Sequence, residues 1–220
     1  MLNLLFPKIC NGCQSTLDDG NKTLCLRCRH ALPLASYHLN GNDRMKNIFY
    51  GRVPLKNATA LFEFQKKGIT QHIMHNLKYR DQEEISYFFG RWLGAELKEL
   101  PAYSDVDLVI PVPLHKQKLK KRGYNQVTGF ATEIAAALNV PYRDNILLKV
   151  SKTNSQVFKK RLMRIQEDEV FSITHSEAIE NKHILLVDDI VTTGATLENC
   201  ANKLLQKSNV TLSFATMAIA

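Results

Sequence analysis

The feature that most constrains the fold lies near the end of the chain, where an apolar run leads through two acidic residues into a turn and a helix. Residues 183–187 read His-Ile-Leu-Leu-Val, and Asp188 and Asp189 follow directly. Such a short, nearly continuous apolar run is typical of a strand covered on both faces. After the turn, the apolar positions of residues 197–205 have helical spacing. The pattern predicts a buried strand, a turn and a helix in direct succession.

The polar groups of this unit suit a phosphorylated sugar. In an open parallel sheet, ligands bind beyond the carboxyl ends of the strands, where Asp188 and Asp189 stand. Two adjacent carboxylates can accept hydrogen bonds from a pair of sugar hydroxyls. The turn offers backbone N–H groups at the start of a helix, which favours a phosphate, and Gly194 lets the backbone approach it closely. The alternative is an ordinary turn with a threonine-rich helix cap. The turn comprises Thr192, Thr193, Gly194, Ala195 and Thr196.

The rest of the chain predicts an α/β fold, with a mostly parallel, twisted sheet and helices on both faces. Strands are expected over residues 58–64, 106–112, 145–149, 183–187 and 210–219. Helices are expected from Gly68, over residues 85–93 and over residues 127–138, where apolar residues recur at helical spacing. Residues 31–57 are interpreted as a connector, and a basic loop is expected between residue 112 and the helix at 127.

Four of the five cysteines form two Cys-x-x-Cys pairs near the start of the chain. This spacing is typical of a zinc ion held by four thiolates, which leave no open position for water, so the zinc is expected to be structural. Two disulfides are the alternative, and a reducing compartment disfavours them. The fifth, Cys200, lies on an apolar helix face and is interpreted as a buried hydrophobic residue. The predicted ligands are Cys10, Cys13, Cys25 and Cys28.

Composition and charge narrow the class of protein. With 45% hydrophobic and 23% charged residues, the chain is globular rather than disordered or fibrous. No apolar run comes near the roughly 20 residues that span a bilayer, and the N-terminus lacks the features of a signal peptide. We therefore expect a cytoplasmic protein without a membrane span.

The net charge of +8 is concentrated in two clusters. Basic clusters attract phosphate, on a small molecule or along a nucleic acid, and solvated loops are the alternative reading. The first cluster comprises Lys116, Lys118, Lys120, Lys121 and Arg122, and the second Lys149, Lys152, Lys159, Lys160, Arg161 and Arg164.

Residues 184–196 resemble the phosphoribosyl pyrophosphate-binding signature of type I phosphoribosyltransferases at nearly every position. Other motifs resemble the ComF family, which is associated with DNA uptake during natural competence. They are Pro-Val-Pro-Leu-His at 111–115, Lys-Arg-Gly-Tyr-Asn-Gln at 121–126, Leu-Lys-Tyr-Arg at 77–80, Thr153 with Gln156, Lys159, Arg161 and Arg164, and the four-cysteine module. The chain departs from the family pattern at Asp81, where glycine is frequent, and at Glu167, near which asparagine is expected.

The resemblance implies a role for each part of the site. Asp188 and Asp189 would bind the ribose hydroxyls of phosphoribosyl pyrophosphate, and residues 192–196 would hold its 5-phosphate. Magnesium, bridged by pyrophosphate and ribose oxygens, is implied as well. The loop of Pro113, Leu114 and His115 would give backbone groups to the pyrophosphate, while cationic side chains, Lys121 and Arg122 among them, would stabilise it as a leaving group. His115 is also considered as a general base, with a structural role as the alternative.

Three functions fit these patterns. The first is a phosphoribosyltransferase whose acceptor the sequence does not name. The second is a non-catalytic module that binds single-stranded DNA through its basic face and works with other proteins of DNA uptake or recombination. The third is a regulator that senses phosphoribosyl pyrophosphate without turnover. The expected small-molecule partner is phosphoribosyl pyrophosphate or ribose 5-phosphate. The expected domains are a zinc module at 1–32, a connector and hood at 33–105, and a phosphoribosyltransferase core at 106–220.

Overall fold

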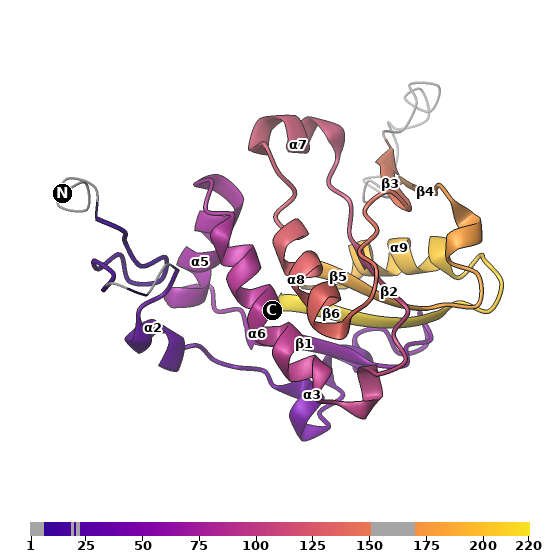
Figure 1. The fold of residues 1–220 in the computed structure, drawn as a ribbon, viewed down its shortest axis with the longest axis horizontal. Coiled ribbons are helices and arrows are strands. Elements are labelled where there is room, and N and C mark those ends of the chain that lie inside the picture. Colours follow the sequence, from indigo (N-terminus) through magenta and orange to yellow (C-terminus); the bar gives the residue numbers. More distant parts are fainter. Residues whose placement is uncertain (1–6, 19, 21–22, 151–169) are drawn as a thin grey trace, which may run out of the picture.

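A parallel β-sheet forms the centre of the molecule (Figure 1). The computed structural model describes residues 7–18, 20, 23–150 and 170–220. The strands of the sheet lie in the order β1–β6–β5–β2, and each neighbouring pair is parallel. Their bounds are Ala58–Glu63 for β1, Leu108–Pro111 for β2, His183–Val191 for β5 and Thr211–Ile219 for β6. The predicted fold class, a mostly parallel sheet flanked by helices, is confirmed.

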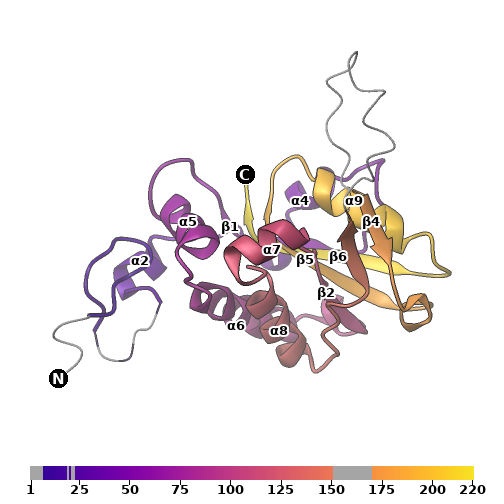
Figure 2. The same cartoon turned by 90° about the horizontal axis from the view of Figure 1, so that it is seen from above.

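Helices cover both faces of this sheet (Figures 1 and 2). On one face lie α5 (Ile69–Tyr79), α6 (Glu84–Lys98) and α8 (Thr128–Leu138), close to the predicted bounds. On the other face lie α4 (Arg44–Asn47) and α9 (Ala195–Leu204). The short 3-10 helix η1 (Pro101–Tyr103) leads from α6 toward β2. Among the described helices, none combines the length and the apolar character that a membrane crossing requires.

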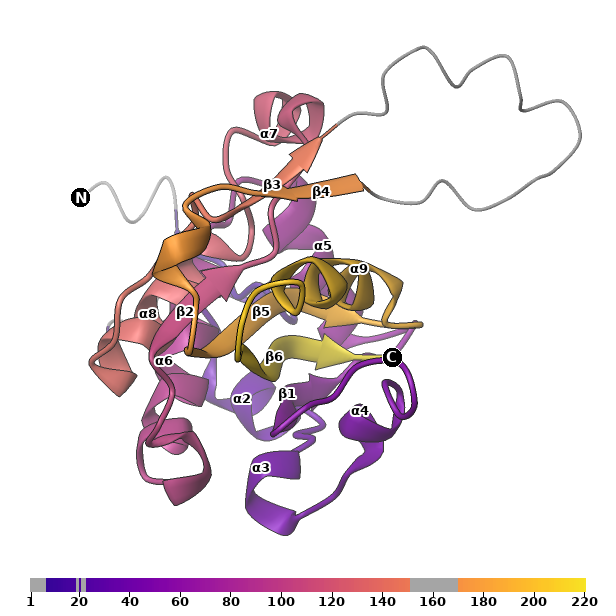
Figure 3. The ribbon, with the colours of Figure 1, turned by 90° about the vertical axis from the view of Figure 1, so that its right-hand side faces the viewer.

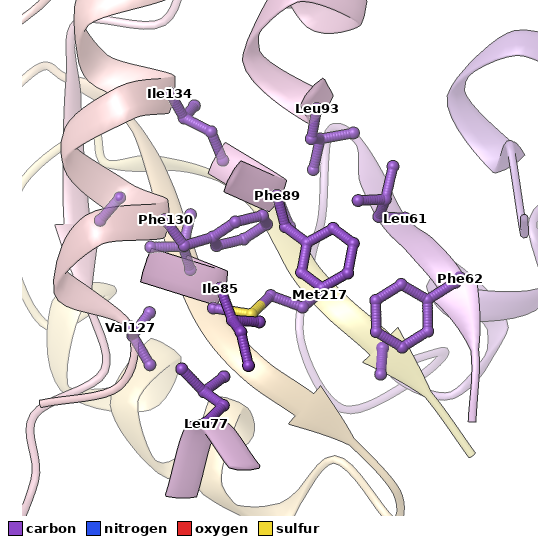
Figure 4. Close-up of a cluster of buried hydrophobic side chains, with 14 of the residues drawn as sticks. Leu61, Phe62, Leu77, Ile85, Phe89, Leu93, Val127, Phe130, Ile134 and Met217 are labelled. Atoms are coloured by element: carbon purple, nitrogen blue, oxygen red, sulfur yellow. The ribbon is translucent and has the colours of Figure 1, made fainter. Parts of the chain in front are cut away.

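The core between the sheet and its first helical layer is built from large apolar side chains (Figure 4). The rings of Phe62 on β1 and Phe89 on α6 lie 5.1 Å apart, and both side chains are fully buried. Helices α6 and α8 approach closely at Gly90, where an added Cβ would come within 2.7 Å of the Phe130 carbonyl oxygen. Close packing of this kind fixes the distance of both helices from the sheet.

Residues 31–57 are more than the connector that the sequence analysis expected. They form two short helices, α3 (Tyr37–Asn40) and α4, and Met45, Phe49 and Val53 are buried against the second face of the sheet. These three apolar residues recur every four positions, which is helical spacing. The prediction was wrong here because polar and glycine residues around them obscured a short apolar stripe.

The predicted strand at 145–149 does not join the main sheet. It forms β3 (Leu147–Val150), which pairs antiparallel with β4 (Val170–Ile173) in a separate two-stranded ribbon (Figure 3). Strand β4 contacts α9, and the 3-10 helix η3 (Ser176–Ala178) leads from it toward β5. Strand β4 is not among the predicted strands, because its four residues follow a polar, basic segment of the sequence.

The basic loop expected after residue 112 is a helix, α7 (Lys116–Arg122). Its residues are lysine, glutamine, leucine and arginine, all of which favour helices. The His115 side chain caps the first turn by accepting a hydrogen bond from the Gln117 N–H at 3.2 Å, and the helix ends at Gly123. The basic cluster is therefore carried on an ordered helix rather than on a flexible loop.

The N-terminal module packs against the first helical layer. It contains the short helix α2 (Leu26–His30), and its Gly12 carbonyl lies 3.2 Å from His72 Nδ1 on α5. Asn76, also on α5, donates its side-chain N–H to the Asn11 carbonyl at 3.2 Å. The sheet pairs β1 with β6, and α6 packs on α8, so both contacts cross residue 105. The domain boundaries proposed after residues 32 and 105 stay a prediction.

Candidate functional site

The strand, turn and helix predicted at residues 183–205 are all present. Strand β5 ends at Val191, and α9 begins at Ala195 with Gly194 as its N-cap residue. A small cavity of about 60 Å³ lies at this junction and is lined by Asp188 and by the turn of residues 192–196. The turn therefore presents the start of a ten-residue helix to the cavity, an arrangement that favours an anionic group.

Gly194 meets two structural requirements at this turn. Its φ of 82° lies in the left-handed region, which side chains other than glycine adopt at a cost. An added Cβ would also come within 2.6 Å of the Phe49 ring. The Arg52 guanidinium donates to the Thr193 carbonyl at 3.3 Å and to Glu198 Oε2 at 2.6 Å. The segment that carries Phe49 and Arg52 therefore supports the turn from outside, a role that the sequence analysis missed.

The two adjacent acidic residues lie on opposite faces of β5, because side chains alternate along a strand. Asp188 shares a face with Leu186, which packs toward α9, and it lines the cavity. Asp189 shares a face with Val187, which packs toward α5, α6 and α8, and it does not line the cavity. Both are buried, at 8% and 4% exposure, and the Asp189 N–H donates to Asp188 Oδ1 at 2.8 Å.

Asp189 is held by two side chains from distant parts of the sequence. The Lys78 ammonium on α5 lies 2.9 Å from Asp189 Oδ2, and the Gln126 side-chain N–H donates to the same oxygen at 2.8 Å. The side chains of Lys78 and Asp189 are 24% and 6% exposed, so this ion pair is largely shielded from water. Arg122 in turn donates to the side-chain oxygen of Gln126. The predicted cation Arg122 thus reaches Asp189 through Gln126.

Further contacts join the same two segments. The Tyr124 hydroxyl donates to the Leu77 carbonyl, and the Arg122 guanidinium lies 5.6 Å from the centre of the Tyr79 ring. Burial raises the pKa of Tyr124 to about 12, so its hydroxyl stays protonated as a donor. Asn125 donates to the Val112 carbonyl at 3.1 Å, which ties the second segment to the end of β2. Residues 77–80 and 122–126, noted separately in the sequence, form one structural unit.

The remaining predicted site residues lie around α7. Pro113, Leu114 and His115 are half-buried in the loop between β2 and α7, and Lys121 is exposed on the helix. None of them lines the cavity at residues 192–196. The Nδ1 atom of His115 caps α7, which favours the structural alternative for this residue over a general base. The structure thus brings Asp188 together with the turn, and Arg122 together with Asp189.

Of the two departures from the family pattern, Asp81 lies within the described residues. It has a φ of 54°, in the left-handed region where glycine is most at ease and aspartate is tolerated. The chain therefore keeps at Asp81 a backbone shape that suits the glycine frequent in the family. Glu167, Thr153, Gln156 and the basic residues from 152 to 164 lie outside the described residues.

The four cysteines of the N-terminal module converge as predicted. Their sulfur atoms all lie within 4.8 Å of one another, and those of Cys13 and Cys25 are 3.7 Å apart. Four sulfurs bound to one zinc ion at about 2.3 Å would lie roughly 3.8 Å apart, so the cluster fits a tetrahedral metal site. Hydrogen bonds with Ser15 lower the pKa of Cys13 to about 6, whereas burial raises the pKa of the Cys28 thiol.

Backbone groups also point toward these sulfurs. The N–H groups of Gly12 and Cys25 donate to the Cys10 sulfur at 3.4 and 3.3 Å, and the Cys28 N–H donates to the Cys25 sulfur at 3.4 Å. Such hydrogen bonds stabilise thiolates, the form that binds a metal. None of the described cysteines forms a disulfide bond. The module can hold a metal ion.

A second polar surface lies between this module and α5. A cavity of about 360 Å³ lies where the module meets α5. Its lining contains histidine, arginine and amide side chains but no acidic one. Beside it, the Tyr79 ring is 67% exposed and lies 5.2 Å from the His75 ring. Tyr124, the aromatic residue of the basic region in the sequence, is by contrast half-buried. The cavity is lined by Ile9, Asn11, Gln14, His72, His75, Asn76, Arg80 and Gln82.

Comparison with known proteins shows what the chain resembles. The family model described as "Phosphoribosyl transferase domain" matches residues 128–219, which include β5, the turn and α9. A purine phosphoribosyltransferase structure from Pyrococcus horikoshii is 18% identical and covers 63% of this chain and 73% of its own, with a TM-score of 0.40.

Two curated relatives extend over nearly the whole chain. "Competence protein F" of Haemophilus influenzae is 28% identical over 216 residues, covering 92% of this chain and 86% of the relative. "Competence protein ComFC" of Bacillus subtilis is 26% identical over 213 residues, covering 94% and 82%. These comparisons confirm the resemblance noted in the sequence: residues 128–219 match a phosphoribosyltransferase domain, and the chain is similar over nearly its whole length to the ComF competence proteins.

Proposed function

We propose that this protein binds phosphoribosyl pyrophosphate with magnesium and acts in DNA uptake or DNA handling. The observation that carries the proposal is the cavity in which Asp188 faces the glycine-containing turn of residues 192–196. In this proposal the buried carboxylate accepts hydrogen bonds from ribose hydroxyls, and the turn receives the 5-phosphate. The names of the relatives, which are competence proteins, support the biological context.

The reaction that such a site would serve is transfer of the phosphoribosyl group to an acceptor. The bond between the anomeric carbon and pyrophosphate breaks, positive charge builds on that carbon, and the leaving group takes up negative charge. Magnesium, when bound, neutralises part of the pyrophosphate charge, and Asp188 offers the kind of oxygen ligand that this ion prefers. Lys121 and Arg122 lie on and at the end of a helix beside the loop of residues 113–115, where a leaving pyrophosphate would meet cations.

Isothermal titration with phosphoribosyl pyrophosphate and magnesium tests this proposal. Asp188→Asn keeps the size of the side chain but removes its charge, and we expect the affinity to fall about 10- to 100-fold, the usual loss for a hydrogen bond to a charged group. Asp43→Asn, an exposed acidic residue outside the cavity, is the matched control and should leave affinity unchanged. No heat with the wild-type protein, or equal affinity for Asp188→Asn, would refute the site. Release of pyrophosphate with a panel of nucleobases and ammonia then identifies an acceptor.

A second function, binding of single-stranded DNA, is favoured by the exposed ring of Tyr79. Bases stack on exposed aromatic rings, and nearby cations contact the backbone phosphates. Tyr79 is flanked by the Arg122 guanidinium and the His75 ring, and α7 carries four further positive charges. None of these residues lines the cavity at residues 192–196, and this surface shares Lys121 and Arg122 with the proposed pyrophosphate site.

Fluorescence anisotropy with a labelled single strand tests this second function. Tyr79→Ala should weaken binding about tenfold, as expected for the loss of one stacked base. Tyr50→Ala removes a ring that is 87% exposed on a different segment, and it should have no effect. Affinity should also fall steeply between low and physiological salt. Equal loss in both variants, or an affinity indifferent to salt, would argue against this surface.

For the N-terminal module, we propose that the bound metal is zinc and that its role is structural. The support is the donor set of four sulfurs, which zinc prefers and which leaves no coordination position for a substrate. Zinc analysis of the purified protein, with one ion per chain expected, is the direct test. A content of zero in protein purified without chelators would contradict it.

A further inference from the structure

The ion pair between Lys78 and Asp189 stands out because both charges are withdrawn from water. Moving a carboxylate out of water is unfavourable unless a partner compensates its charge. The Lys78 ammonium supplies that charge at 2.9 Å, and the Gln126 N–H adds a hydrogen bond to the same oxygen at 2.8 Å. Apolar residues of the same size would fill this space at lower cost. A purely structural explanation therefore does not account for the choice of these residues.

The direction of each contact indicates what the pair does. Lys78 and Gln126 both bind Oδ2 of Asp189, so they fix the rotation of the carboxylate as well as its position. The Asp189 N–H is bonded to Asp188, the residue that lines the cavity. The carboxylate of Asp188 is therefore held in position before a ligand arrives, and binding has to immobilise fewer groups.

The segments that carry Lys78 and Gln126 are themselves tied together. Tyr124 donates to the carbonyl of Leu77, directly before Lys78, and Arg122 donates to Gln126 while lying over the Tyr79 ring. These contacts fix the positions of Lys78 and Gln126 relative to each other while both bind Asp189. Lys78 lies at the end of α5, and Gln126 lies in the turn between α7 and α8.

We propose that Lys78, together with Gln126, is a positioning residue: it fixes Asp189, whose N–H in turn holds Asp188 Oδ1 and so sets the orientation from which the Asp188 carboxylate binds the ribose. The inference rests on the proposed function, since it concerns the same phosphoribosyl site. It adds two residues, neither of which lines the cavity beside Asp188. It also gives the paired acids different tasks: Asp188 faces the cavity, and Asp189 depends on Lys78 for its place.

Binding of ribose 5-phosphate and magnesium, measured by titration calorimetry, tests the proposal. Lys78→Met keeps the length of the side chain but removes its charge, and affinity should fall about tenfold or more, the usual cost of losing a partner that orients a ligand-binding group. Lys78→Arg keeps the charge and should retain most of the affinity. Lys98→Met, an exposed lysine at the end of α6, is the matched control and should bind as the wild type does. Gln126→Glu places a like charge beside Asp189 and should weaken binding too.

A double-mutant cycle separates positioning from a general loss of structure. If Lys78 acts through Asp189, adding Lys78→Met to Asp189→Asn should change the affinity less than about twofold, because the group to be positioned has already been altered. The same tenfold loss in both backgrounds would overturn the proposal, as would a Lys78→Met variant that binds like the wild type. Absence of binding by the wild-type protein would instead refute the proposed function, and this role of Lys78 with it. Thermal unfolding of each variant verifies that all are folded at the titration temperature.

Discussion

The N-terminal cysteine module and the sheet core achieve their structures by different means. The module contributes few buried apolar residues, chiefly Leu17, Leu24 and Leu32, and its most buried polar atoms are sulfurs that receive backbone hydrogen bonds. The core instead buries whole strands and several phenylalanine rings. A segment as short as the module cannot bury enough apolar surface to fold without help. We therefore expect a metal ion to stabilise the module and the hydrophobic effect to stabilise the core.

Function divides along the same line. The groups that suit a phosphoribosyl ligand all belong to the core. The module contacts α6, where the Arg29 guanidinium lies 4.9 Å from the centre of the Phe88 ring, and α5, where it binds His72 and Asn76. Lys78 lies on that same helix, about half a turn beyond Asn76. Helix α5 therefore connects the cysteine module with Asp189.

Metal removal should give the largest effect and the clearest separation of the two regions. Structural zinc sites bind with apparent free energies of about 10–16 kcal/mol, so a chelator, or Cys10→Ser with Cys28→Ser, should unfold the module. The core should keep its own cooperative transition in urea, because most of the apolar side chains in its two buried clusters lie outside the cysteine module. Limited proteolysis should then cut within the first 32 residues. Loss of the core transition on chelation would show that the two regions fold as one.

A substitution in the core should lower the stability of the core and leave metal binding by the module unchanged. Phe89→Ala removes a fully buried ring that packs against Phe62, and it should lower the free energy of unfolding of the core by about 3–5 kcal/mol. The metal content should stay at the wild-type level. Urea unfolding followed by circular dichroism, with zinc analysis of the same sample, measures both. A metal content that falls together with core stability would contradict the view that the module and the core are stabilised independently.

Gly194→Ala should affect the phosphate turn with a smaller cost in stability. Forcing alanine into the left-handed region costs about 1–3 kcal/mol, and its Cβ would also press on the Phe49 ring. Affinity for ribose 5-phosphate should fall further in Gly194→Ala than in Phe89→Ala, although the latter is less stable. Titration of both variants at a temperature where they are folded tests this order, and the reverse order would contradict it.

The smallest effect is expected from removing the ion pair between Lys56 and Asp105. A hydrogen bond from Lys56 holds the pKa of Asp105 below its ordinary value of about 3.9. Because the folded pKa is the lower one, this carboxylate stabilises the fold above about pH 4, and that contribution is lost as the pH falls through the folded pKa. Lys56→Met should therefore move the acid-unfolding midpoint slightly upward. The Asp105 side chain is 53% exposed, which keeps the effect small, and a downward shift would contradict the assignment.

Local patterns in the sequence predicted what depends on neighbouring residues. The apolar run at 183–187, the turn after it and the two cysteine pairs each signal their structure within a few positions, and each is present as expected. Helix α7 could have been predicted from its residue types and was wrongly read as a loop because of its charge. The helical spacing of Met45, Phe49 and Val53 is likewise a local signal, weakened by the polar residues around it.

Contacts between distant segments left no such signal. Nothing in the sequence indicates that Lys78 would reach Asp189, which lies 111 positions later, or that Phe49 would pack beneath Gly194. The alternation of side chains along β5 does predict that Asp188 and Asp189 point to opposite faces. That rule needs only the sequence, and it separates the two acids.

The central claim is that a phosphoribosyl group binds where Asp188 faces the turn of residues 192–196. The most direct measurement is a titration of ¹⁵N-labelled protein with ribose 5-phosphate, followed through the backbone amide resonances. We expect the largest shifts of the amide resonances at residues 192–196 and smaller shifts at Asp189 and Lys78. Shifts confined to the basic helix Lys116–Arg122, with the turn unchanged, would contradict it.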